Sequence, residues 1–245
     1  MGLYDNTVEV ARRCMVLFFV VDTSGSMAGT KIGAVNQAIA EVVPEIAKLS
    51  SENADAEIKI AAMKFDDAAE WITSQPVEAE KFQWNDLDVG GGTYLGEACR
   101  ALGEKLSRNA FMQEATGSYA PAIFLMSDGE PLDDYQKELA KLKENRWFQK
   151  AIKVAIAIGN GADKNVLAEF TGTTERVLEA HSPEVLMKLI KFVSVRASQI
   201  GSKSTNTLPI GKTDSIPSKQ EDFTTGLQAD AIQAVGGSIA GDEDF

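Results

Sequence analysis

An uninterrupted apolar run, Met15–Val21 (MVLFFVV), constrains this chain more than any other feature of its sequence. A run of this length that is rich in β-branched and aromatic residues predicts a strand buried on both faces. Two further runs, Pro121–Met126 (PAIFLM) and Ile152–Ile158 (IKVAIAI), have the same character. Because strands buried on both faces occur in parallel sheets covered by helices, the three runs indicate an α/β fold.

Helical patterns separate the apolar runs. Apolar residues recur at three- and four-residue spacing over Thr30–Leu49, which predicts an amphipathic helix, and Pro44 is expected to kink or divide it. Further helices are expected from Leu95, from Tyr135, near Lys164–Phe170 and after Ser182 and Pro183. This alternation of strands and helices predicts a doubly wound, mostly parallel, Rossmann-like sheet with helices on both faces.

One hairpin is expected at the edge of this sheet. Glu57–Phe65 (EIKIAAMKF) alternates like a strand, and Asp66 and Asp67 follow as a turn into a second short strand, Ala69–Thr73. The hairpin therefore predicts one antiparallel edge strand beside the parallel ones.

The chain is expected to form one α/β domain over residues 10–200, followed by a tail. From Gly201 the composition shifts to Ser, Thr, Gly and Asp, which predicts a flexible acidic C-terminal tail over residues 201–245. The alternative is that part of this tail forms one or two amphipathic turns that dock on the domain. The apolar residues that would form them are Leu227, Ala231, Ile232 and Val235.

The charge balance excludes several classes of partner. The chain has 36 acidic and 24 basic residues, and its net charge of -12 disfavours binding to nucleic acids and to anionic membrane surfaces. No apolar run approaches the ~18 residues that a membrane span requires. His181 is the only histidine, so histidine-based catalytic triads and multi-histidine zinc sites are excluded by count.

The two cysteines indicate a cytoplasmic location. Cys14 and Cys99 have no CxxC partner, and their apolar surroundings predict buried, reduced thiols. Such thiols are typical of a reducing compartment.

A signal peptide is the alternative interpretation of the first apolar run, because Arg12 and Arg13 precede it. However, Asp5 and Glu9 lie in the supposed basic region, and Asp22 follows the run at once. These acidic residues favour a buried strand over a signal peptide.

The loop after the first run carries oxygen-bearing side chains at alternate positions. Asp22, Ser24 and Ser26 offer one carboxylate and two hydroxyls, which are hard ligands that suit magnesium rather than a soft metal. A loop at the carboxyl end of a parallel strand opens into the crevice where α/β sheets hold their ligands. These three residues therefore predict a metal site at the end of the first strand.

Two other motifs match what such a site would need. Gly91-Gly92-Thr93 precedes an expected helix, and Ser127-Asp128-Gly129 follows a buried strand. Together with the DxSxS loop at Asp22, they resemble the three conserved loops of the von Willebrand factor A domain with its metal-ion-dependent adhesion site. Each motif alone is weak, but all three occur in order and at the expected ends of strands or starts of helices.

The resemblance implies a role for each polar residue. Ser24, Ser26 and Thr93 would contact a divalent cation directly, whereas Asp22 and Asp128 would hold waters and orient the hydroxyls. Mg²⁺ is the expected cation, and Mn²⁺ or Ca²⁺ would also accept oxygen ligands. Neutral ligands leave most of the positive charge unneutralised, so the remaining position would attract a Glu or Asp of a protein partner. The simpler interpretation is that these residues only cap helices and start a turn.

Within this family, residues 12–198 most resemble bacterial TerY-type proteins of tellurium-resistance and stress loci. The segments that carry this likeness are DTSGSM, GGTYLGEA and LMSDGEP. The resemblance implies a non-catalytic scaffold that works beside a protein kinase and a PP2C-type phosphatase. Ser and Thr residues of the tail would then be phosphorylation sites, although solubility and flexibility explain them more simply.

An enzyme is the main rival hypothesis. A magnesium-dependent phosphohydrolase would use Asp22 as nucleophile, but Ser24 stands where that chemistry needs a second carboxylate, and no general base is nearby. The segment Gly25–Lys31 only weakly resembles a phosphate loop, because its glycine-to-lysine spacing differs. A purely structural domain is the third interpretation. We therefore expect a metal-dependent protein-binding domain that is not an enzyme.

Overall fold

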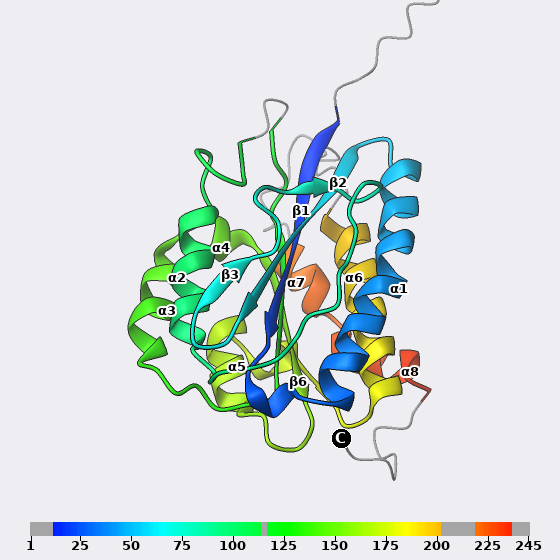
Figure 1. Ribbon diagram of the computed structural model, residues 1–245. Coiled ribbons are helices and arrows are strands. Elements are labelled where there is room, and N and C mark those ends of the chain that lie inside the picture. Colours follow the sequence, from blue (N-terminus) through cyan, green and yellow to red (C-terminus); the bar gives the residue numbers. More distant parts are fainter. Residues whose placement is uncertain (1–11, 114–116, 202–218, 237–245) are drawn as a thin grey trace, which may run out of the picture.

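The computed structural model describes residues 12–113, 117–201 and 219–236, which form a central sheet between two layers of helices (Figure 1). The strands of the sheet are β1 (Arg13–Asp22), β2 (Ala56–Phe65), β3 (Ala69–Trp71), β4 (Val77–Glu78), β5 (Ala122–Ser127), β6 (Ile152–Ile158) and β7 (Val177–Ala180). The helices are α1 (Thr30–Glu52), α2 (Leu95–Lys105), α3 (Tyr135–Glu144), α4 (Arg146–Lys150), α5 (Lys164–Thr171), α6 (Pro183–Gly201), α7 (Lys219–Thr224) and α8 (Leu227–Ala234). Two short 3-10 helices, η1 (Gly25–Met27) and η2 (Thr174–Arg176), complete the described elements.

The strand order places a topological switch point between β1 and β5. The order across the sheet is β3-β2-β1-β5-β6-β7, and β4 pairs with β2. β1, β2, β5, β6 and β7 are parallel, whereas β3 and β4 run antiparallel to β2. In such sheets the crevice for a ligand opens where the strand order reverses, at the carboxyl ends of the strands. The expected doubly wound, mostly parallel sheet with an antiparallel edge strand is confirmed; the two-residue strand β4 was not expected.

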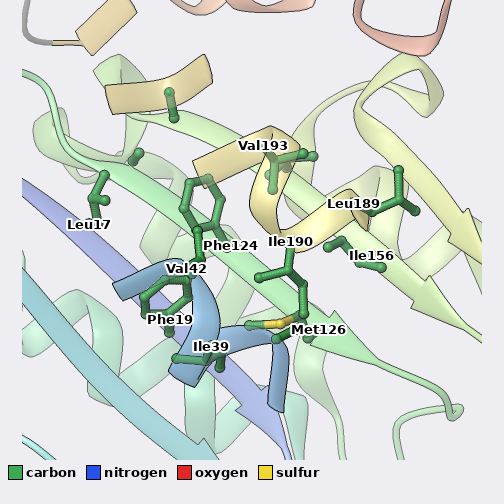
Figure 2. Close-up of a cluster of buried hydrophobic side chains, with 14 of the residues drawn as sticks. Leu17, Phe19, Ile39, Val42, Phe124, Met126, Ile156, Leu189, Ile190 and Val193 are labelled. Atoms are coloured by element: carbon green, nitrogen blue, oxygen red, sulfur yellow. The ribbon is translucent and has the colours of Figure 1, made fainter. Parts of the chain in front are cut away.

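Strand β1 divides the hydrophobic core into two halves. Its side chains from Cys14 to Val21 are at most 1% exposed, and alternate residues point to opposite faces of the sheet. Phe19 packs with Phe124 of β5 on the face covered by α1 and α6, where Figure 2 shows Ile39 and Ile190 beside them. Residues of α2, α3, α4 and α5 cover the opposite face. Burial on both faces explains why the sequence of β1 is continuously apolar.

Helix α1 continues through Pro44, so of the two expected effects, a kink or a division, the division does not occur. A proline inside a helix removes one main-chain hydrogen bond to the residue four positions earlier, which here is Ala40. Both Pro44 and Ala40 are exposed, so the freed carbonyl faces water rather than the core. The loss is therefore tolerated on the solvent side of a helix whose other face packs against β1 and α6.

The C-terminal segment 219–236 packs on the domain, which differs from the expectation of a flexible tail. Phe223, Leu227, Ala231 and Val235 are at most 4% exposed and belong to the core beside α6. Arg196 of α6 donates to the main-chain oxygens of Phe223 (3.2 Å) and Thr225 (2.6 Å). The docked amphipathic turns, which we considered as the alternative, therefore match the structure. The rest of the expected tail, 202–218 and 237–245, lies outside the described residues, as does the expected domain start at residue 10.

Two smaller expectations concern the cysteines and membrane spans. Cys14 and Cys99 are both buried and are not joined in a disulfide, as their surroundings predicted. Across 12–113, 117–201 and 219–236, no helix has the length and apolarity to cross a membrane.

Candidate metal centre

The candidate site lies at the switch point, where β1 and β5 end side by side. Asp22 is the last residue of β1 and Ser127 is the last residue of β5. The hydroxyl of Ser127 donates to Asp22 Oδ2 (2.6 Å), and the main-chain N–H of Ser24 donates to Asp22 Oδ1 (2.9 Å). Asp22 is 0% exposed. Its carboxylate therefore holds the start of the loop that follows β1 from inside the protein.

A short chain of hydrogen bonds joins the other polar residues of the two strand ends. Ser24 Oγ lies 3.0 Å from Ser26 Oγ, and the Ser26 hydroxyl donates to Asp128 Oδ1 (2.7 Å). Ser24 and Asp128 are buried, whereas Ser26 is exposed. The oxygens thus form a cluster that is enclosed by the protein on one side and open to solvent at Ser26.

Thr93 reaches this cluster from the loop before α2. The main-chain N–H of Gly25 donates to Gly91 O (3.0 Å), and that of Gly90 donates to Thr23 O (2.8 Å). These two bonds tie the Thr93 loop to the loop after β1. The structure therefore brings all five predicted residues together: Asp22, Ser24, Ser26, Thr93 and Asp128.

Gly129 leaves a space between the hydroxyls of Thr93 and Ser26. A Cβ atom placed on Gly129 would lie 3.1 Å from Thr93 Oγ1 and 3.6 Å from Ser26 Oγ. A side chain there would fill the space toward which the two hydroxyls converge. The donor set consists only of hard oxygens, three hydroxyls and two carboxylates, which suits Mg²⁺ and similar cations. Among the described residues, no site contains three or more His, Cys, Asp or Glu side chains, so a cation here would depend on the hydroxyls.

Neighbouring residues hold the Thr93 loop in place. Asp67, in the turn between β2 and β3, accepts a hydrogen bond from the N–H of Gly92 (2.7 Å). Thr93 O accepts from the N–H of Leu132 (2.8 Å), which lies in the loop after β5. Gly91 has a φ of 69°, a conformation that favours glycine, and a Cβ there would be 2.8 Å from the Asp67 carboxylate. These bonds therefore hold the Thr93 loop through groups outside the oxygen cluster.

Charge in the site is concentrated on two buried carboxylates. Burial raises the pKa of Asp22 above its usual value; hydrogen bonds from Ser127 and Ser24 oppose this rise, and the nearby charge of Asp128 adds to it. Asp128 has a direct counter-charge, because the ammonium of Lys31 lies 2.5 Å from its Oδ2. A positive charge placed among these oxygens is electrostatically favoured.

Four further residues take part in the site without having been assigned a role from the sequence: Ser127, Lys31, Asp67 and Leu132. Lys31 had one signal, since a lysine in the first turn of a helix opposes the helix dipole and needs a specific acidic partner. Leu132 is 70% exposed beside the Thr93 loop, an unusual position for a large apolar side chain. Nothing in the sequence indicated that Ser127 or Asp67 would hold the loops, because their partners lie far along the chain.

Comparison with solved structures finds the same fold in proteins of low sequence identity. A von Willebrand factor type A protein from Catenulispora acidiphila is 16% identical, with a TM-score of 0.56 over 77% of this chain and 43% of that chain. The ArnB paralog VWA2 from Sulfolobus acidocaldarius is 16% identical, with a TM-score of 0.54 over 72% and 44%. Proximal thread matrix protein 1 from the mussel byssus, with a zinc-occupied MIDAS (metal-ion-dependent adhesion site) motif, is 19% identical. Its TM-score is 0.53 over 77% of this chain and 46% of that chain. The chain thus spans less than half of each of these solved chains.

Sequence comparison supplies the family. No curated protein sequence matches the chain significantly. The family model for the von Willebrand factor type A domain, however, matches residues 17–191, from the first buried strand into the last long helix. This range covers most of the chain and all three loops of the candidate site. The chain therefore belongs to the von Willebrand factor type A domain family.

Proposed function

We propose that this domain is a non-catalytic protein-binding module that holds a divalent cation, most simply Mg²⁺, and captures an acidic residue of a protein partner. The observation that carries the proposal is the clustering of five oxygen-bearing side chains from three loops, with the hydroxyls of Thr93 and Ser26 facing the space beside Gly129. Domains of this family are generally adhesion or scaffold modules, and they commonly mediate protein–protein interaction through a metal-ion-dependent adhesion site.

Each residue would have a separate task at the site. Ser24, Ser26 and Thr93 would offer hydroxyl oxygens directly to the cation, which prefers about six oxygen ligands. Asp22 and Asp128 would orient these hydroxyls and hold waters. The bound cation would supply a position that attracts a carboxylate. Because the serines and the threonine are neutral, they would leave that position strongly positive.

The surroundings of the site support protein binding. Ser26 is exposed, so a partner's side chain can approach the oxygen cluster from solvent. Leu132 is one of only two large apolar side chains exposed within the described ranges, and its N–H is bonded to Thr93 O. Apolar side chains on the rim of a polar site are typical of protein-binding surfaces. We infer that Leu132 contacts an apolar side chain next to the partner's acid.

The burial of Asp22 argues against the phosphohydrolase alternative. A nucleophilic carboxylate must reach a phosphorus atom, but Asp22 is 0% exposed and both of its oxygens accept hydrogen bonds. The position two residues later holds Ser24, whose hydroxyl interacts with Ser26 rather than serving as an acid. These contacts favour a framework role for Asp22.

The resemblance to TerY-type proteins extends the proposal to a cellular setting. We infer a cytoplasmic scaffold in a bacterial stress or tellurite-resistance system, with a protein kinase and a PP2C-type phosphatase as partners. The buried thiols Cys14 and Cys99 are in keeping with a reducing compartment. Thr224 and Thr225, two of the tail residues considered as phosphorylation sites, donate hydrogen bonds to main-chain oxygens of α7, namely those of Gln220 and Glu221.

Isothermal titration calorimetry with Mg²⁺ tests the metal site. The wild-type protein is expected to bind one equivalent, and Ser26→Ala and Thr93→Ala are expected to lose binding while the circular dichroism spectrum stays unchanged. Ser51→Ala is the matched control, because Ser51 is an exposed serine on α1 away from the site. Binding of Mg²⁺ that survives both site substitutions would contradict the proposal.

Peptide arrays test partner capture. Peptides with a central Glu next to an apolar residue are compared with the same peptides carrying Gln, in Mg²⁺ and in EDTA. Binding is expected only for Glu peptides in Mg²⁺, and Leu132→Ser is expected to weaken it. Equal binding of Glu and Gln peptides, or binding that ignores EDTA, would argue against recognition of an acid through the cation.

A further inference from the structure

Lys31 makes the only direct ion pair that reaches the carboxylates of the site within the described residues. Its ammonium donates to Asp128 Oδ2 (2.5 Å) and to the main-chain oxygen of Ser26 (3.2 Å). The Asp128 side chain is 0% exposed, and the Lys31 side chain is 21% exposed. A buried carboxylate needs a counter-charge, and Lys31 supplies it from the rim of the site.

The position of Lys31 in the helix costs energy, which its contacts with Asp128 and Ser26 offset. Lys31 lies in the first turn of α1, where the helix dipole disfavours a positive charge, and that turn contains no acidic residue to compensate. The side chain also loses rotamer freedom when it is held at two acceptors. The interaction with Asp128 must outweigh both costs, so the pair is a built feature of the site rather than an incidental surface contact.

The same geometry places Lys31 in competition with a cation. Asp128 accepts from Lys31 at Oδ2 and from the Ser26 hydroxyl at Oδ1, so both of its oxygens are engaged. Ser26 is likewise bonded at its hydroxyl and at its main-chain oxygen. A divalent cation bound at the hydroxyls of Ser24 and Ser26 would stand close to the ammonium. Two positive charges at such short range repel each other, which favours displacement of the ammonium when a cation binds.

We propose that Lys31 is an internal competitor for the divalent cation: its ammonium neutralises Asp128, and binding of the cation displaces it toward solvent. This inference rests on the metal-dependent function proposed above and concerns the regulation of that same site. Lys31 thereby lowers the affinity for the cation, and occupancy of the site responds to the metal concentration. The displaced ammonium remains at the rim, where it adds positive charge beside the position offered to a partner's acid.

Titration of Mg²⁺ into Lys31→Met tests the proposal, since methionine keeps the length of the side chain and removes its charge. The dissociation constant is expected to fall at least tenfold relative to the wild type. Lys31→Gln, which keeps a hydrogen-bond donor without the charge, is expected to bind more tightly as well and serves if the methionine variant does not fold. Lys48→Met is the matched control on the same helix, because Lys48 is exposed and pairs only with Glu52 at 3.8 Å; its affinity should be unchanged.

Thermal unfolding gives a second readout. Without Mg²⁺, Lys31→Met is expected to melt below the wild type, because Asp128 loses its counter-charge. With saturating Mg²⁺, the order is expected to reverse. Equal dissociation constants for the wild type and both Lys31 variants, or weaker binding by the variants, would overturn the role of Lys31 and leave the metal site intact. Absence of Mg²⁺ binding in the wild type and in every variant would overturn the proposed function and this inference together.

Discussion

The hydroxyl of Ser127 donates a 2.6 Å hydrogen bond to Asp22 Oδ2, which joins the ends of β5 and β1 across the switch point of the sheet. These strands pair in parallel, with Val21 beside Met126. The next residue of each strand, Asp22 and Ser127, therefore lies beside the other at the carboxyl edge of the sheet. The bond links two of the three loops that carry the candidate site, and it does so inside the protein, away from water.

Ser127→Ala is expected to destabilise the protein, because it leaves one oxygen of a buried carboxylate without a donor. Hydrogen bonds to charged groups contribute about 1.5–3 kcal/mol, and a loss in this range is expected in urea-induced unfolding. The control is Ser74→Ala at an exposed bend between β3 and β4, for which no measurable change is expected. A loss below about 0.5 kcal/mol for Ser127→Ala would show that the bond does not hold the loops.

Gly129→Ala is expected to weaken Mg²⁺ binding at least tenfold. The added Cβ would stand 3.1 Å from Thr93 Oγ1 and close the space beside Ser26. The backbone of Gly129 does not have positive φ, so alanine is conformationally allowed and the fold should persist. Gly33→Ala on α1 is the control: nothing lies within 4 Å of the added atom, and stability should rise by about 0.5–1 kcal/mol without a change in Mg²⁺ affinity. Unaltered binding in Gly129→Ala would place the cation elsewhere.

Phe223→Ala is expected to destabilise the domain by about 3–5 kcal/mol, measured by denaturant-induced unfolding. Phe223 is 0% exposed in the core beside α6, so its removal leaves a cavity where α7 docks. Ile232→Ala on α8 is the apolar control. Because Ile232 is 42% exposed, this substitution should lower the free energy of unfolding by less than about 1 kcal/mol. If both substitutions cost equally little, the segment 219–236 contributes no stability to the domain.

The free energy of unfolding of the wild type, measured relative to that of Lys153→Met, is expected to rise between about pH 8 and pH 10.5. Burial, together with the nearby charge of Arg176, lowers the pKa of Lys153 from 10.5 to about 8 in the folded protein. In this window the unfolded chain binds a proton at Lys153 and the folded chain does not, so deprotonation favours folding as the pH rises. The full gain is on the order of 3 kcal/mol. Below pH 8 the difference between the two proteins should be constant.

The measurement for this prediction is chemical denaturation of both proteins from pH 7 to pH 10.5. Comparison with the variant subtracts the titration of all other groups. Lys153 donates to the main-chain oxygens of Phe148 (2.7 Å) and Ala151 (3.2 Å), and a neutral amine can keep both bonds. Parallel stability profiles for the two proteins would mean that the ammonium stays charged in its buried position.

The sequence could predict the elements that depend on local patterns. The buried strands were recognisable because residues such as Phe18 and Phe19 are buried on opposite faces of one strand, which requires a continuous apolar run. The loop residues Asp22, Ser26 and Asp128 could be predicted because parallel strands deliver their carboxyl ends to one edge. The strands follow from the periodicity of the chain, whereas the roles of Thr93 and Asp128 followed from the resemblance to the family.

The contacts between distant side chains could not be predicted. Lys31 and Asp128 are 97 positions apart, and only the folded topology brings them within hydrogen-bonding distance. The docking of α7 and α8 was obscured by the polar composition of the C-terminal region. Phe223 and Leu227 follow a four-residue spacing, but such short helices are stabilised by packing against α6 rather than by their own propensity.

The bonds that tie the loops together have a consequence for engineering. They run between main-chain atoms or, for the exposed Asp67, from a main-chain N–H to its carboxylate, so they do not involve the side chains at Glu130 and Leu132. Exposed positions such as Glu130 and Leu132 can therefore be randomised while the oxygen cluster keeps its shape. A library built at these two positions would test whether the residues beside the oxygen cluster set the choice of partner in the proposed capture of acidic peptides.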